Sequence, residues 1–124
     1  MQALELRTSD GVTLAVPPRL DSITTYVLLE QETWFEKEMS FLRCWLRPGM
    51  TAIDIGANLG VYSLPIARLV GPNGRVFSYE PASEPRSLLA RSRELNAVGN
   101  LDILAAALSD GEREGHPCSV DRAS

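Results

Sequence analysis

The chain has 124 residues, of which 44% are hydrophobic and 23% are charged, a balance ordinary for a soluble globular protein. The formal net charge is −4 and no block of lysine and arginine interrupts the sequence, so the composition argues against a nucleic-acid partner. No apolar run is long enough to cross a membrane, and residues 1–14 lack the basic-then-apolar pattern of a signal peptide. We therefore expect a cytoplasmic protein without a membrane partner.

The residues that most often bind metals are sparse. Cys44 and Cys118 are the two cysteines and His116 is the one histidine, and they do not have the spacing of a metal site. We expect reduced thiols and no metal.

The N-terminal part, residues 1–32, predicts a β-hairpin followed by a segment that caps the domain. Apolar residues alternate with polar ones over Leu4–Thr8 and Val12–Val16, and Asp10-Gly11 between them is a signal for a two-residue turn. Residues 22–29 are compatible with a helix or a strand, and the pattern does not decide between them.

A helix is expected over residues 33–47. Thr33 and Glu36 have the spacing of a capping box, an apolar face follows, and Pro48-Gly49 ends the helix.

Residues 51–60 form the segment around which the rest of the chain is organised. The apolar run 52–55 predicts a buried strand, and Gly56, Asn58 and Gly60 follow it at every second position. Glycine allows backbone angles and close approaches that a Cβ forbids, and asparagine tolerates the left-handed conformation well. A ligand could therefore contact the main chain at this turn.

The next two elements strengthen this interpretation. Residues 59–70 have helical spacing, so unpaired N–H groups at the helix start would face the ligand, although Pro65 predicts a kink or a later start. A second strand, 75–80, ends in Glu80, twenty residues after Gly60, where dinucleotide-binding folds place a ribose-binding carboxylate. A carboxylate suits a ribose because its two oxygens can accept from both hydroxyls.

Asp54 distinguishes this turn from a dinucleotide site. A carboxylate directly before the turn would repel a pyrophosphate, and it suits a cationic group such as the amino group of a methionine moiety.

The sequence Ile-Asp-Ile-Gly-Ala-Asn-Leu-Gly (53–60), followed later by Tyr-Glu-Pro (79–81), resembles motif I and the segment after it in class I S-adenosylmethionine-dependent methyltransferases, and the FkbM family in particular. The resemblance covers residues 23–110. It implies S-adenosyl-L-methionine as cofactor, Asp54 near the methionine ammonium, and main chain near Leu108 at the adenine. It also implies O-methylation of a hydroxyl on a small molecule, sugar or natural product.

The remaining pattern completes an α/β fold. A helix over 83–96 and a buried strand over 101–108 follow Glu80, and alternating strands and helices imply right-handed crossovers and a parallel sheet in the order 3-2-1. Residues 33–110 then form a partial Rossmann-like domain, and 111–124 are expected to be a disordered or truncated tail.

A complete doubly wound methyltransferase needs about seven strands, so the sequence reads as the N-terminal half of one. We expect such a fragment to be inactive alone and to have an open edge at its last strand, through which it could self-associate. Two alternatives stay open: a fragment of an NAD-dependent oxidoreductase, and a non-catalytic fragment that binds a partner strand.

Overall fold

The structure is a computed structural model that describes residues 2–19, 21–31, 36–109 and 121–123. The expected helix start at Thr33 lies outside these residues. Within them, no helix is both long and apolar enough to span a membrane.

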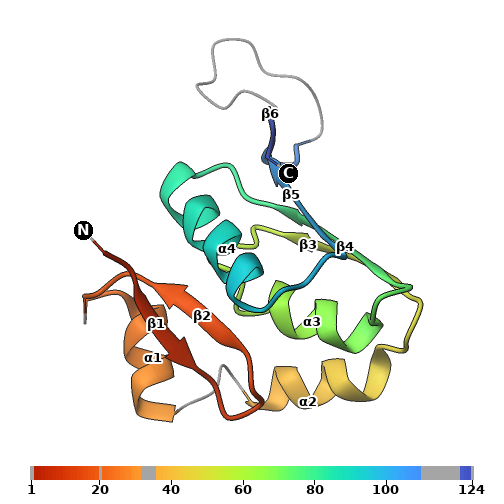
Figure 1. The fold of residues 1–124 in the computed structure, drawn as a ribbon, viewed down its shortest axis with the longest axis horizontal. Helices are drawn as coiled ribbons and strands as arrows, with labels where there is room; N and C mark the ends of the chain where they lie inside the picture. Colours follow the sequence, from red (N-terminus) through yellow and green to blue (C-terminus); the bar gives the residue numbers. More distant parts are fainter. Residues whose placement is uncertain (1, 20, 32–35, 110–120, 124) are drawn as a thin grey trace.

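A parallel sheet forms the centre of the molecule (Figure 1). Its strands are β3 (Thr51–Ile55), β4 (Arg75–Tyr79) and β5 (Leu101–Ala105), in the order β3-β4-β5. Asp54 lies opposite Ser78 in the register of β3 with β4. The predicted α/β architecture with a parallel three-strand sheet is confirmed.

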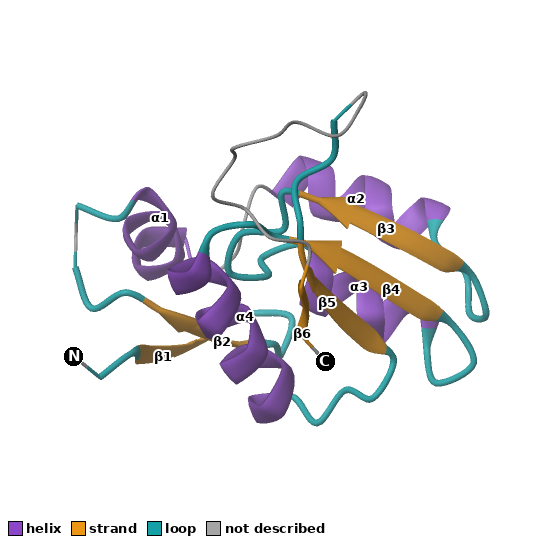
Figure 2. Ribbon diagram, turned by 90° about the horizontal axis from the view of Figure 1, so that it is seen from above, coloured by secondary structure: helices purple, strands orange, loops and turns teal. Residues whose placement is uncertain are grey.

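Two helices connect these strands, α3 (Ser63–Val70) after β3 and α4 (Ser83–Leu95) after β4. Alternate residues of β4 show which face the helices cover. Val76 and Ser78 are completely buried, whereas Phe77 and Tyr79 on the opposite face are half-buried. The sheet therefore has one well-buried face, on which α3 and α4 pack (Figure 2).

Pro65 does not kink α3, because the helix begins at Ser63 and the proline falls in its first turn, where its missing N–H is not needed. The later start that Pro65 predicted is therefore confirmed.

The N-terminal hairpin packs against α4 and not against the sheet (Figure 1). It pairs β1 (Leu4–Arg7) with β2 (Thr13–Val16) in antiparallel fashion. The two-residue turn expected from the sequence is wrong, because Arg7 pairs with Thr13 and leaves a longer loop in which Gly11 has φ +88°. The undecided segment that follows is a helix, α1 (Ile23–Gln31).

Helix α2 (Glu36–Trp45) precedes the central strand. Its Met39 is buried and Leu42 packs against the core, while Phe41 and Trp45 stack on each other with ring centroids 6.1 Å apart and remain mostly exposed. α2 thus has one face in the core and one apolar face in solvent.

The third strand is shorter than expected, because β5 ends at Ala105 and not at Leu108. Residues 121–123, within the part expected to be a disordered or truncated tail, form a short strand, β6 (Asp121–Ala123). β6 pairs antiparallel with β5, with Ile103 opposite Ala123. The edge of the sheet that is unpaired among the described residues is therefore β3, not the last parallel strand.

Candidate functional site

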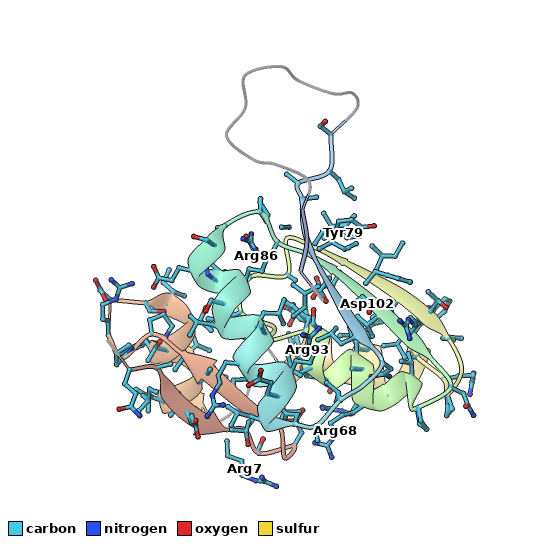
Figure 3. The ribbon with its side chains drawn as sticks, turned by 45° about the horizontal axis from the view of Figure 1, so that its top comes forward. Arg7, Arg68, Tyr79, Arg86, Arg93 and Asp102 are labelled. Atoms are coloured by element: carbon cyan, nitrogen blue, oxygen red, sulfur yellow. The ribbon has the colours of Figure 1, made fainter. Side chains whose placement is uncertain are left out.

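The loop after β3 is fixed to the carboxyl end of β4. The main-chain N–H groups of Gly56 and Ala57 both donate to the carbonyl oxygen of Tyr79, at 2.9 and 3.0 Å. Figure 3 shows Tyr79 at this end of the sheet, with Arg86 on the neighbouring helix. The loop and the end of β4 consequently form one structural unit.

Asn58 adopts the left-handed conformation that its residue type suggested, with φ +54°. In this conformation its main-chain N–H donates to Glu80 Oε1 at 2.8 Å. The predicted conformation is confirmed, and it links the turn directly to the acid that ends the second strand.

The two glycines of the turn have different reasons to be glycine. Gly56 has φ +70° and a Cβ there would have nothing within 4 Å, so its bare main chain faces open space. Gly60 has φ +101°, but a Cβ there would lie 2.5 Å from Leu64 Cδ2 and 2.6 Å from Leu89 Cδ1, both completely buried side chains. Close packing with the core therefore accounts for Gly60, whereas Gly56 leaves room for a ligand.

Glu80 is only 7% exposed and holds two segments together. Its Oε1 accepts from Asn58, and its Oε2 accepts from the N–H of Ala82 at 2.9 Å, at the start of α4. Arg86 Nη1 donates to the carbonyl oxygens of Glu80 and Pro81, at 3.2 and 2.8 Å. Each carboxylate oxygen has a second lone pair, so the carboxylate can still accept from two hydroxyls.

Asp54 points to the helix-covered side of the sheet. Its Oδ2 accepts from Ser63 Oγ at 2.5 Å, and Ser63 Oγ lies 2.7 Å from Ser78 Oγ. Burial raises the pKa of Asp54, the hydrogen bond from Ser63 lowers it, and the charge of Glu80 raises it further, with a net increase.

A cavity of about 500 Å³ adjoins Asp54. Such a volume is in the range of small-molecule sites. It is lined by Asp54 and Ile53 of β3, by side chains of α2, and by Tyr62 and Ile66 around α3.

The structure brings together four of the six residues expected to bind a cofactor. Asp54, Gly56, Asn58 and Glu80 gather at the carboxyl ends of β3 and β4. This is where ligands bind in open parallel sheets.

The other two predicted residues are placed differently. Gly60 contributes through packing, as described above. Leu108 follows β5 in an irregular segment and is 54% exposed.

Sequence reasoning missed Ser63 and Ser78. The sequence did contain a signal for Ser78. It stands two residues after Val76 in a short strand, so it lies on the same buried face, and a buried hydroxyl needs a hydrogen-bond partner. Ser63 carries no such signal, since it stands at a helix start, where serine is common. Within the described residues, no group of three acidic, cysteine or histidine side chains could hold a metal ion.

Comparison with known proteins gives two curated relatives, and no family model matches the chain. The antimetabolite synthetase AmbE of Pseudomonas aeruginosa is 34% identical over 91 residues, 73% of this chain and 4% of that protein. The protein-L-isoaspartate O-methyltransferase of Methanothrix thermoacetophila is 33% identical over 66 residues, 53% of this chain and 30% of that protein. The chain thus spans less than a third of either relative.

Solved structures share the fold of this chain. A SAM-dependent O-methyltransferase from Thermotoga maritima has a TM-score of 0.58 and 25% identity, covering 91% of this chain and 44% of that one. The chain has the fold of class I methyltransferases.

Two further structures agree with this assignment. A protein-L-isoaspartate O-methyltransferase has a TM-score of 0.54 and 24% identity, over 58% of this chain and 23% of that one. A protein of Clostridium thermocellum assigned as an rRNA methylase has a TM-score of 0.56 and 20% identity, over 60% and 41% of the two chains. Proteins with this fold thus include some named for protein and for RNA methylation, so the fold alone does not give the acceptor.

Proposed function

We propose that this chain is the cofactor-binding part of a methyltransferase and that it binds S-adenosyl-L-methionine. The observation that carries the proposal is the turn at residues 56–60, joined through Asn58 to Glu80, with Asp54 two residues before it. The shared fold and the names of the similar proteins support it.

The residues of the site suit such a ligand. Glu80 would accept hydrogen bonds from the ribose hydroxyls through its free lone pairs, and Asp54 would face the ammonium of the methionine moiety. The exposed main chain at Gly56 would allow the ligand to approach closely. We extend the proposal to Leu108, whose segment lies beyond the carboxyl end of β5 and would border the adenine.

S-adenosylmethionine carries its own activated methyl group on a sulfonium, so the protein mainly holds and orients the reactants. The residues named here would hold the donor. We assign no base and no acceptor pocket to them.

As a finer proposal, we suggest an FkbM-like O-methyltransferase that acts on a hydroxyl of a small molecule, sugar or natural product. The wording of residues 53–60 and of Tyr79-Glu80-Pro81 supports it, together with the match to a segment of an antimetabolite synthetase. The net charge of −4 favours such an acceptor over nucleic acid. We further propose a cytoplasmic location.

Calorimetry with the 124-residue chain tests the cofactor. We expect binding of S-adenosylmethionine and of its demethylated product, and weaker or no binding of NAD, because Asp54 would repel a pyrophosphate. Tighter binding of NAD than of either methyl-donor ligand would support an oxidoreductase instead.

One observation favours a second candidate, a role in binding a partner strand. In the part of the chain that the structure describes, β3 has an unpaired edge, and Ile53 and Ile55 on it are 61% and 62% exposed. Such an edge is a template for another strand. A chain that associates but has no affinity for S-adenosylmethionine would support this candidate over the first.

A further inference from the structure

Three hydroxyl and carboxyl groups form a hydrogen-bonded row beneath the turn. Ser78 of β4, Ser63 of α3 and Asp54 of β3 come from three consecutive elements of the fold. Their oxygen atoms are joined at 2.7 and 2.5 Å, and both serine residues are completely buried.

The donors in this row have one consistent order when Asp54 is ionised. A carboxylate only accepts, so Ser63 must donate its single hydroxyl proton to Asp54 Oδ2. Ser63 then has no proton left for Ser78, and Ser78 must donate to Ser63. The two hydroxyl dipoles therefore both point toward the carboxylate and strengthen each other.

The row also fixes the direction of the carboxylate. With Oδ2 bound to a buried helix residue, Asp54 cannot rotate freely, and the structure gives Oδ1 no partner among the described residues. Oδ1 is thus the oxygen left to a ligand at the turn.

We propose that Ser63 and Ser78 are positioning residues, which keep Asp54 ionised and oriented for the cationic amino group of the ligand. This inference rests on the proposed function and adds two residues to it. Neither serine contacts open space, so each acts through Asp54 and not on the ligand directly.

The charges around Asp54 explain why such support is needed. Burial raises the pKa of Asp54 and the charge of Glu80 raises it further, while the Ser63 hydrogen bond is the opposing influence. The other titratable groups at the adjoining cavity are Lys37 and Glu38 of α2 and the phenol of Tyr62.

The test compares wild type with Ser63→Ala and Ser78→Ala, with Ser87→Ala on the exposed face of α4 as the matched control. Carboxyl ¹³C NMR of the ligand-free protein would follow the titration of Asp54, assigned through its loss in Asp54→Asn. Calorimetry at pH 7 would measure two ligands, S-adenosylmethionine and 5′-methylthioadenosine, which lacks the amino-acid part.

We expect Ser63→Ala to raise the titration midpoint of Asp54, because a hydrogen bond to a charged group is lost. For the same reason it should weaken the binding of S-adenosylmethionine about tenfold or more. Binding of 5′-methylthioadenosine should stay within about twofold, since no ammonium is involved. Ser78→Ala should shift both quantities in the same direction by less, and Ser87→Ala should match wild type.

Three other results would overturn either this inference or the proposed function. An Asp54 titration and an S-adenosylmethionine affinity unchanged in Ser63→Ala would overturn this inference and leave the proposed function standing. Equal loss of both ligands would also overturn it, because it would show a general structural role. Failure of the wild-type chain to bind either ligand would overturn the proposed function, and the positioning of a ligand with it.

Discussion

At the scale of single residues, Glu80 combines a structural and a proposed binding role. Its carboxylate accepts from the main chain of both Asn58 and Ala82, so it organises the turn and the start of α4 before any ligand binds. Replacing it therefore affects folding as well as binding, and an experiment must measure both.

We predict that Glu80→Ala weakens S-adenosylmethionine binding by about 1 to 3 kcal/mol, because the ribose hydroxyls lose a charged acceptor. It should also lower the free energy of unfolding, since two main-chain N–H groups lose their partner. Calorimetry and denaturant unfolding measure the two effects. Glu84→Ala is the control: Glu84 is exposed and forms a surface ion pair with Arg19, at 3.8 Å. Equal effects on binding would show that Glu80 is merely another acid.

The glycines give a second prediction. Gly56→Ala and Gly60→Ala both place a side chain at positive φ, at a cost of about 1 to 2 kcal/mol each. Gly60→Ala also forces a methyl group against Leu64 and Leu89, which adds about 1 to 3 kcal/mol. Urea unfolding should rank Gly60→Ala as the less stable variant. For Gly56→Ala, calorimetry should find a loss of S-adenosylmethionine affinity that is larger, relative to its loss of unfolding free energy, than for Gly60→Ala. A reversed order of stability would contradict the packing role of Gly60.

Asp54 predicts a dependence of stability on pH. Its pKa in the folded protein is raised from 3.8, so between 3.8 and the folded value the folded state binds more protons than the unfolded state. The free energy of unfolding contributed by this residue therefore falls as pH rises through that window and is constant above it. Asp54→Asn should remove this decrease, and denaturant unfolding at a series of pH values would detect it. An identical pH profile in the two proteins would refute the prediction.

At the scale of elements, the hairpin is attached to the domain by polar contacts as well as by its apolar residues. The N–H of Ala15 donates to Ser92 Oγ at 2.8 Å, and both residues are completely buried. Asn96 accepts from the N–H of Thr13 at 2.9 Å and donates to its carbonyl oxygen at 2.6 Å. α4 and Asn96 directly after it thus supply the partners that this side of β2 would otherwise lack.

We predict that Ser92→Ala destabilises the protein by about 1 to 3 kcal/mol, because it leaves the buried N–H of Ala15 without a partner. Ser87→Ala, at an exposed position of the same helix, should change stability by less than about 0.5 kcal/mol. Thermal unfolding measures the difference. Similar melting temperatures for the two variants would mean that water replaces the lost contact.

The elements also show how far the sequence predicts the structure. Strands 52–55 and 75–80 were readable because apolar runs with turn residues at both ends are typical of buried parallel strands, and β3 and β4 lie there. Local sequence patterns did not predict the structure of segments that depend on pairing with a distant part of the chain. Nothing in residues 121–123 indicates a strand, and β6 depends on pairing with β5.

The hairpin turn and the site illustrate the same distinction. Asp10-Gly11 predicted a turn in the right place but the wrong length, since the register of the strands sets the loop. Asp54 and Glu80 were found because their spacing follows a motif, whereas Ser63 becomes significant only when α3 folds over β3.

At the scale of the whole molecule, apolar side chains gather where the sheet ends. Among the described residues β3 pairs only with β4, and Ile53 and Ile55 are exposed beside this open edge. Phe41 and Trp45 on α2 add exposed apolar surface, and Phe41 lines the same cavity as Ile53. Natural proteins usually protect such an edge with charges, prolines or a covering element.

We predict that the 124-residue chain self-associates through the edge of β3, and not through its last parallel strand as the sequence suggested. Sedimentation velocity over a range of concentrations should show reversible association. Ile53→Lys and Ile55→Lys should shift the chain toward monomer. Each lysine would either be buried without a partner at the contact or repel a lysine of the second copy. Ile23→Lys is the matched control, since Ile23 is 74% exposed but lies on α1, which is not part of the sheet. Equal dissociation by Ile23→Lys would place the contact elsewhere, and a monomer at every concentration would show that the open edge alone does not drive association.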